Sequence, residues 1–243
     1  MTASEAKKAQ WEALKDKPLS DKLKYIFTYY WPAILGCVCA IALAVTWVST
    51  ALSQNETALS GYLLNGFTRE SYSGDLKQNF LEHQQIDSNT YSFHLTADVP
   101  YSPEEISENS IGVLESIVVQ IFAGELDFIV ADLNSYPDLT AYFADLRTVM
   151  SANQQEKWSE YFVYVERAEW EKMASDSLDS IVQPIYHLSA ESLQDPVPLG
   201  IRLPTSSLLF DAYQFADKDV IFGITHTAVN VENALAFLEY ITQ

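Results

Sequence analysis

Residues 127–132 read DFIVAD, a run of four apolar residues enclosed by two aspartates. A short apolar run of this kind is typical of a strand that is buried on both faces, as in the middle of a parallel sheet. It follows a stretch with helical spacing of its apolar residues, namely Ile111, Leu114, Ile117, Val118, Ile121 and Phe122. Gly124 is placed to end that helix. We therefore expect a central strand preceded by an amphipathic helix.

Strand and helix patterns alternate on both sides of this segment. Further strands are predicted at residues 61–67, 91–95, 162–166, 199–203 and 220–225. Helices are predicted after Gly74 and Asp75, from Ser102, around residues 142–149, and at 151–161, 206–215 and 230–241, the last capped by Asn230. This alternation predicts an α/β fold with a mostly parallel sheet.

The amino-terminal part contains a candidate membrane span. Residues 31–52, WPAILGCVCAIALAVTWVSTAL, carry no charge, and a spanning helix needs roughly 20 such residues. Six Lys precede this segment, whereas no Lys or Arg follows it until Arg69, so the positive-inside rule places residues 1–30 in the cytoplasm. We expect a cytoplasmic basic and aromatic tail at 1–30, a transmembrane helix at 31–52, a linker at 53–60 and an extracellular domain at 61–243.

Two other interpretations of the apolar segment stay open. Ser49 and Ala51 could precede the cleavage site of a signal peptide, although the polar lead of 30 residues is long for one. Residues 35–37, Leu-Gly-Cys, resemble a lipobox, but apolar residues continue after Cys37. An uncleaved anchor in the cell membrane is therefore favoured.

The charge of the chain is unevenly distributed. The net charge is −19, and the residues after 52 carry eight Lys and Arg against 29 Asp and Glu. A surface this acidic repels nucleic acid, so we exclude a nucleic-acid partner. The two cysteines, Cys37 and Cys39, both lie in the apolar segment, so the outer domain has no disulfide and depends on its hydrophobic core.

Two segments of the outer domain resemble extracellular solute-binding proteins of bacterial ABC transporters. They are residues 122–132, FAGELDFIVAD, and residues 226–241, HTAVNVENALAFLEYI, in which Glu232, Ala234, Phe237 and Leu238 match the family's pattern. The plan of Lys-rich tail, one helix and outer domain is similar to anchored proteins of Gram-positive bacteria. The resemblance implies a fold of the periplasmic-binding-protein type and the binding of a solute. The outer domain, at about 190 residues, is short for a protein of two lobes.

Motifs of catalysis, cofactor binding and metal binding are absent from the sequence. It contains no GxGxxG, GxxxxGK[ST], GxSxG, HExxH or CxxC pattern, and its four histidines have no ligand spacing. We therefore expect no enzyme activity, no cofactor and no metal site.

The candidate ligand-binding residues follow the predicted strands, because ligands of open α/β sheets bind beyond the carboxyl ends of the strands. This rule selects Asn65, Asp98, Tyr101, Asp132, Tyr136, Thr225 and His226. Asp132 is the foremost candidate, since it follows the predicted central strand. At each position a turn or a helix cap is the competing interpretation.

Aromatic and acidic residues also alternate in residues 158–173, WSEYFVYVERAEWEKM. Aromatic faces beside carboxylates suit a sugar or an organic cation, so Trp158 and Trp170 are further candidates for ligand binding. The competing interpretation is that these aromatic side chains belong to the core.

Two functions follow from these observations, and an enzyme remains as a third alternative. The outer domain is either a membrane-anchored binding module for a small polar ligand, or an interaction subunit of a membrane complex that keeps the fold without the ligand. The first requires a polar cleft at the strand ends, and the second requires that cleft to be closed and an apolar surface elsewhere.

The orientation of the chain can be tested with intact protoplasts. We expect added protease to digest the acidic domain and to spare residues 1–30, because the Lys residues hold the tail on the cytoplasmic side. Immunoblotting with antibodies against each end would measure this, and protection of the whole chain would contradict the predicted orientation.

Overall fold

The computed structural model describes residues 55–103, 107–175 and 185–243, together with residues 18, 20, 28, 31–32, 35–36 and 38–46. The chain divides into two compact units, Met1–Gln54 and Asn55–Gln243. Most of the predicted tail at 1–30 lies outside the described residues. Residues 33–34, 37 and 47–52 of the predicted span at 31–52 also lie outside them. Within the described part of the chain, no helix has both the length and the apolar character needed to cross a membrane.

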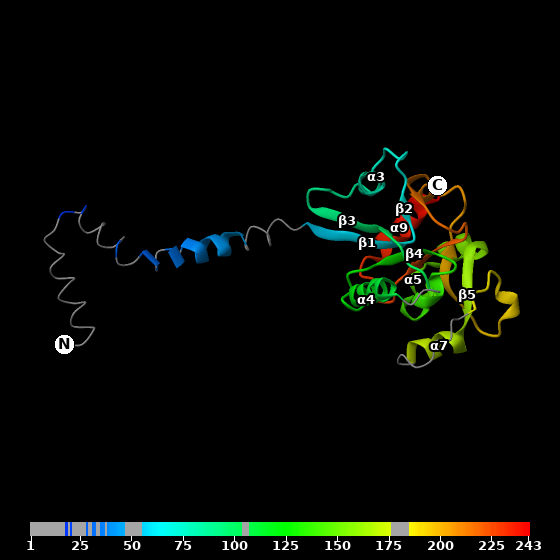
Figure 1. Cartoon of the computed structure of the whole chain (residues 1–243). Helices are drawn as coiled ribbons and strands as arrows, with labels where there is room; N and C mark the ends of the chain where they lie inside the picture. The colour runs from blue at the N-terminus through cyan, green and yellow to red at the C-terminus, as the bar shows by residue number, and fades with distance from the viewer. Residues whose placement is uncertain are drawn as a thin grey trace. The chain divides into compact units, whose positions relative to one another are not determined.

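A six-stranded sheet forms the centre of the unit Asn55–Gln243 (Figure 1). The strands lie in the order β3-β1-β4-β8-β6-β5. Their bounds are β1 Glu56–Leu64, β3 Tyr91–Val99, β4 Phe128–Asp132, β5 Phe162–Glu166, β6 Pro196–Arg202 and β8 Val220–Ile224. Two shorter strands, β2 (Phe67–Thr68) and β7 (Tyr213–Gln214), form a separate antiparallel pair.

The sheet is mixed rather than mostly parallel. β1 pairs in parallel with β3 and with β4, whereas β8 is antiparallel to both β4 and β6, and β5 is antiparallel to β6. β3, β1, β4 and β6 therefore run one way, and β8 and β5 run the other way. The predicted α/β class is confirmed, and the interior position of β4 agrees with its apolar sequence, because all five of its residues are buried.

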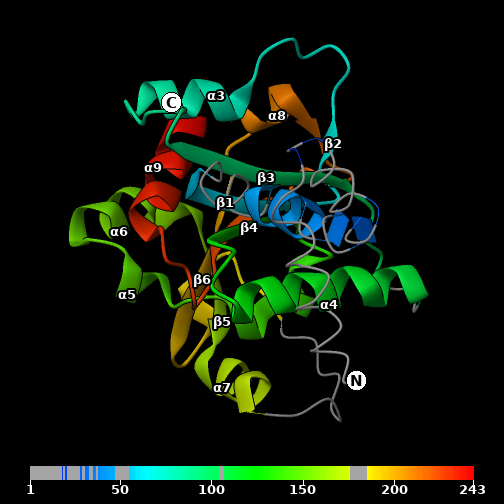
Figure 2. The same ribbon diagram turned by 90° about the vertical axis from the view of Figure 1, so that its left-hand side faces the viewer.

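Helices cover both faces of the sheet. Figure 2 shows α3 (Leu76–His83) and α9 (Val231–Ile241) on one side and α4 (Glu108–Phe122) and α7 (Arg167–Ser175) on the other. The remaining helical elements are η1 Tyr136–Tyr142, α5 Leu146–Val149, α6 Ala152–Trp158, η2 Ser159–Tyr161, η3 Ala190–Ser192 and α8 Leu209–Ala212. The buried residues accordingly form two hydrophobic clusters, one on each face of the sheet.

Alternate residues of β1 and β4 supply these two clusters. Leu59 and Leu63 of β1 pack under α3 and α9, whereas Tyr62 and Leu64 pack under α4. On the α9 face, the ring of Phe128 stacks on Phe222 at 4.9 Å between centroids. Gly61 leaves room for that Phe128 ring, since a Cβ at residue 61 would lie 2.0 Å from it. Burial on both faces is the reason that DFIVAD lacks polar alternation.

Several element boundaries differ from the sequence analysis. β1 begins at Glu56, so residues 56–60 belong to the sheet and not to a linker; its first residues are polar because they are exposed. α4 starts after Ser107, whose hydroxyl accepts from Ser110 N, and not at Ser102. Residues 206–215 contain only the short α8 before the chain extends into β7.

Tyr136 and Phe143 pack closely against the sheet. We therefore expect alanine to destabilise the domain at Gly223, beneath these two rings, and not at Gly112. In Gly223→Ala the new Cβ would lie within 2.7 Å of Phe143 and closer still to the Tyr136 hydroxyl, so we expect a loss of about 1–3 kcal/mol of unfolding free energy. In the control Gly112→Ala, on the exposed side of α4, nothing lies within 4 Å, and we expect a gain of about 0.5–1 kcal/mol. Urea denaturation would measure both, and equal effects would contradict this packing.

Candidate functional site

The carboxyl ends of the parallel strands β1, β3 and β4 meet at one edge of the sheet. Asn65 directly follows β1, Asp98 lies near the end of β3, and Asp132 is the last residue of β4. The parallel pairing of these strands places their ends at the same edge. The structure thus brings together Asn65, Asp98 and Asp132, which were predicted to lie at the carboxyl ends of these three strands.

Asn65 is the centre of a hydrogen-bond network at this edge. Its Nδ2 donates to the carbonyl of Tyr101 at 2.8 Å, to Asp132 Oδ2 at 3.2 Å and to Ser135 Oγ at 3.0 Å, and its Oδ1 accepts from Tyr101 N at 2.7 Å. Its φ of 57° is left-handed, a conformation that Asn tolerates better than most residues. The side chain of Asn65 therefore ties the ends of three chain segments together.

Asp132 faces this network and not a cleft. Its Oδ1 accepts from Ser135 N at 2.9 Å, and only 3% of the residue is exposed. Both carboxylate oxygens are thus engaged by neighbouring residues. This geometry corresponds to the turn-forming interpretation of Asp132.

Tyr101 and Tyr136 are also buried at this edge. The Tyr101 hydroxyl donates to Asp138, and burial together with that carboxylate raises the pKa of Tyr101. The Tyr136 hydroxyl donates to the carbonyl of Leu199 at 2.9 Å, its ring stacks on Phe143, and burial raises its pKa well above the ordinary value. Both tyrosines remain neutral and act in packing.

Asp98 has a local structural partner. Its φ is 61°, and its carboxylate accepts from Thr68 N and Thr68 Oγ1, both at 2.7 Å. Asp98 N donates to the carbonyl of Gly66. The side chain thereby fastens the short strand β2 to the end of β3.

Thr225 and His226 lie at the opposite edge of the sheet. Thr225 N donates to the carbonyl of Asp127, just before β4 begins, and His226 N donates to the carbonyl of Tyr142. The prediction that they lie with Asp132 assumed a parallel β8, whose carboxyl end would lie at the same edge. β8 is antiparallel to β4, so its carboxyl end lies beside the start of β4.

Trp158 and Trp170 do not converge on a common site. Trp158 is buried in the cluster under α3 and α9, and Trp170 packs against the cluster on the α4 face. Neither indole Nε1 has a hydrogen-bond partner within the described part of the chain. The two tryptophans lie in α6 and α7 and pack on opposite faces of the sheet.

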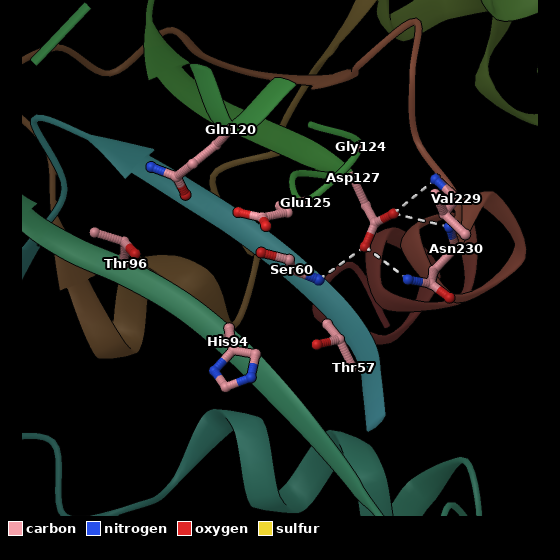
Figure 3. A pocket seen from close by; sticks show the side chains of 10 residues that line it. All are labelled: Thr57, Ser60, His94, Thr96, Gln120, Gly124, Glu125, Asp127, Val229 and Asn230. Atoms are coloured by element: carbon pink, nitrogen blue, oxygen red, sulfur yellow. Dashed lines mark hydrogen bonds between the residues drawn. The ribbon is translucent and has the colours of Figure 1, made fainter. Parts of the chain in front are cut away.

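A polar cavity of about 450 Å³ lies at the edge where β1 and β4 begin (Figure 3). Figure 3 shows Gln120 and Glu125 on one side of it, facing Ser60 on β1 and His94 and Thr96 on β3. The remaining lining residues are Thr57, Gly124, Asp127, Val229 and Asn230. None of these ten residues was among the candidates selected from the sequence.

Asp127 forms the inner wall of this cavity. Its carboxylate accepts four hydrogen bonds, from Ser60 N at 2.8 Å, Val229 N at 3.0 Å, Asn230 N at 2.8 Å and Asn230 Nδ2 at 3.2 Å. The Asn230 side chain therefore bonds to Asp127 and does not cap α9. A buried carboxylate with four donors is fully satisfied, so it stabilises the fold and leaves no free acceptor for a ligand.

The sequence alone offered no signal for this arrangement. Asp127 was visible only as the polar residue before an apolar run, and its donors come from residues 60, 229 and 230, far away in the chain. In the described part of the chain, no group of three or more His, Cys, Asp or Glu is arranged to hold a metal ion.

Comparisons with known proteins leave the family open. The chain matches no protein-family model, and neither a curated protein nor a solved structure is detectably similar to it. The geometry of the two sheet edges is therefore the basis for the functional proposals that follow.

The network at Asn65 predicts the effect of Asp132→Asn. The new amide would direct its NH2 group at either the Asn65 Nδ2 or the Ser135 N, so one buried donor would lose its acceptor. We expect a loss of about 1–3 kcal/mol of unfolding free energy. The matched control is Asp211→Asn, because the Asp211 carboxylate is exposed and makes no hydrogen bond to the described residues. Melting curves would measure both, and an unchanged Asp132→Asn protein would contradict the structural role.

Proposed function

We propose that this chain is a membrane-anchored interaction subunit, in which an outer domain with a fold like that of solute-binding proteins contacts another protein. The observation that carries the proposal is the closed carboxyl edge of the sheet. Asp132 is buried there, and Asn65, Ser135 and Tyr101 are occupied by one another. A solute at this edge would have to displace these internal hydrogen bonds.

An exposed apolar surface supports contact with a protein. It consists of Ile111, Val119, Phe122 and Val229, which we call the α4 surface, with exposed fractions of 46%, 67%, 68% and 72%. Ile111, Val119 and Phe122 are spaced by eight and three residues, so they lie on one side of the helix. Val229 lies beside Gly124 at the end of the helix, since its Cγ2 is 3.6 Å from the Cβ position of Gly124. A group of exposed large apolar side chains is typical of an interaction site.

The charge around the α4 surface indicates the chemistry of the partner. Residues 78–146, which include α4, contain no Lys or Arg, and the exposed acids Glu108, Glu115 and Glu125 lie on or next to this helix. A second copy of the chain would bring like charges together. Glu115 lies one helical turn from both Ile111 and Val119, so the surface is complementary to a protein that combines apolar side chains with Lys or Arg.

The predicted anchor supports a partner in the same membrane. The uncharged segment 31–52 would hold the outer domain close to other proteins of the cell membrane, and tethering raises the effective concentration of both partners. A modest apolar surface is then sufficient for a lasting contact.

The α4 surface can be tested by substitution in the full chain. In cells that produce the protein natively, we expect mild-detergent extracts to contain it in an assembly larger than the monomer on native electrophoresis. The double variant Val119→Ser, Phe122→Ser should migrate as the monomer, because loss of a buried aromatic anchor typically costs about 2 kcal/mol or more of binding free energy.

The control removes two exposed apolar side chains elsewhere on the domain. Ile185 and Leu188 are 64% and 50% exposed and lie outside α4, so Ile185→Ser, Leu188→Ser should leave the assembly intact. A monomeric native protein, or an assembly that survives the α4 double variant, would contradict the proposed function.

A further inference from the structure

The cavity at the amino-terminal edge of β1 has the size of a small-molecule site. Its volume of about 450 Å³ lies within the range of roughly 300–1,000 Å³ that is usual for ligand pockets. Its lining comes from β1, β3, the end of α4, the segment between α4 and β4, and the loop before α9. It is therefore built from elements that the sheet and Asp127 hold in place.

The position of α4 explains why this part of the sheet is open. Ile117 and Ile121 pack in the same cluster as Tyr62 and Leu64, the residues in the second half of β1. On β3, Phe93 and Leu95 pack on the opposite face, so His94 and Thr96 point to the α4 side. Both of these polar residues are exposed. The cavity thus lies where the helix leaves the polar part of this face uncovered.

The lining offers several hydrogen-bonding groups that are not used within the protein. Among the described residues, the hydroxyls of Thr57, Ser60 and Thr96 and the carboxylate of Glu125 have no hydrogen-bond or ion-pair partner. The Gln120 side chain donates through Nε2 to Ser116, which leaves its Oε1 unoccupied. These groups surround one space, as Figure 3 shows.

The charge of the lining selects a cationic ligand. None of the ten lining residues is Lys or Arg, and the Asp127 carboxylate is saturated, so Glu125 is the one unpaired carboxylate among them. The strongly acidic outer domain would also raise the local concentration of cations. The hydroxyls match a ligand with several hydroxyl groups of its own.

The polar wall of the cavity is preorganised. Asp127 fixes β1 against the start of α9 through four hydrogen bonds, and the His94 Nε2 lies 2.9 Å from Ser92 Oγ. These bonds fix the backbone around the cavity, which lowers the conformational entropy that is lost when a ligand binds.

From this geometry we propose that the cavity binds a small hydroxylated amine, such as an amino sugar. Glu125 receives the ammonium group, and Ser60, Thr96 and Gln120 bond to the hydroxyl groups. The site lies apart from the closed edge at Asp132. It adds a ligand to the proposed interaction subunit and shares only Val229 with the α4 surface.

Calorimetric titration of the full chain in detergent micelles tests the proposal, with protonated glucosamine as the probe. We expect saturable binding of glucosamine, and at least tenfold weaker binding of glucose, which has hydroxyl groups but no ammonium group to pair with Glu125. Absence of saturable glucosamine binding, or equal binding of the two sugars, would overturn the proposal.

Two charge-matched variants locate the site. Glu125→Gln should weaken glucosamine binding at least tenfold, whereas Glu115→Gln, on α4 but outside the cavity, should leave it unchanged. Thr96→Val should also weaken binding without a change in melting temperature, because the Thr96 hydroxyl makes no hydrogen bond to the residues that the structure describes. Equal affinity of the wild type and Glu125→Gln would contradict the assignment of Glu125 as the partner of the ammonium group.

The same titration separates this proposal from the proposed function. The double variant Val119→Ser, Phe122→Ser should retain the glucosamine affinity of the wild type, since neither residue lines the cavity. Loss of the assembly with retained affinity supports two independent sites. Loss of affinity in this double variant would refute the independence of the cavity.

Discussion

The buried carboxylate of Asp127 is the interaction on which this domain depends most. Asp127 directly precedes β4 and accepts hydrogen bonds from β1 and from the residues just before α9. Three distant parts of the chain therefore meet at one side chain. A carboxylate withdrawn from water is costly unless each oxygen is hydrogen-bonded. Asp127 meets that condition with four donors. The same contacts set the inner wall of the polar cavity.

The antiparallel strand β8 divides the two edges of the sheet into different environments. By entering between β4 and β6 in the opposite direction, it moves Thr225 and His226 to the edge where Asp127 lies. The carboxyl ends of β1, β3, β4 and β6 lie at the other edge, where Asn65 and its neighbours join the ends of β1, β3 and β4. One edge is consequently closed by hydrogen bonds within the protein, and the other keeps an open polar cavity.

Helix α4 links the two proposed sites without merging them. Its buried side, with Ile117 and Ile121, anchors it to the sheet, and its outer side presents Val119 and Phe122 to solvent. The chain just beyond its end contributes Glu125 to the cavity. Val119 and Phe122 are large apolar residues on an exposed side of the helix that also carries Glu115 and Ser116. These two exposed apolar side chains are the basis of the proposed contact with a partner.

The sequence by itself determined the α/β class, the buried strand at residues 128–132 and the helices α3, α6 and α9, because apolar periodicity and residues such as Asp75 and Ser151 act over a few neighbouring positions. It also selected Asn65, Tyr101 and Asp132, which do lie together. The sequence did not determine the direction of the strands, because an apolar run such as 220–224 has the same pattern in a parallel and in an antiparallel strand. Only the tertiary structure decided which groups are saturated and which are free. Hydrogen bonds such as that from Val229 N to Asp127 join residues about a hundred positions apart, and no local pattern records them.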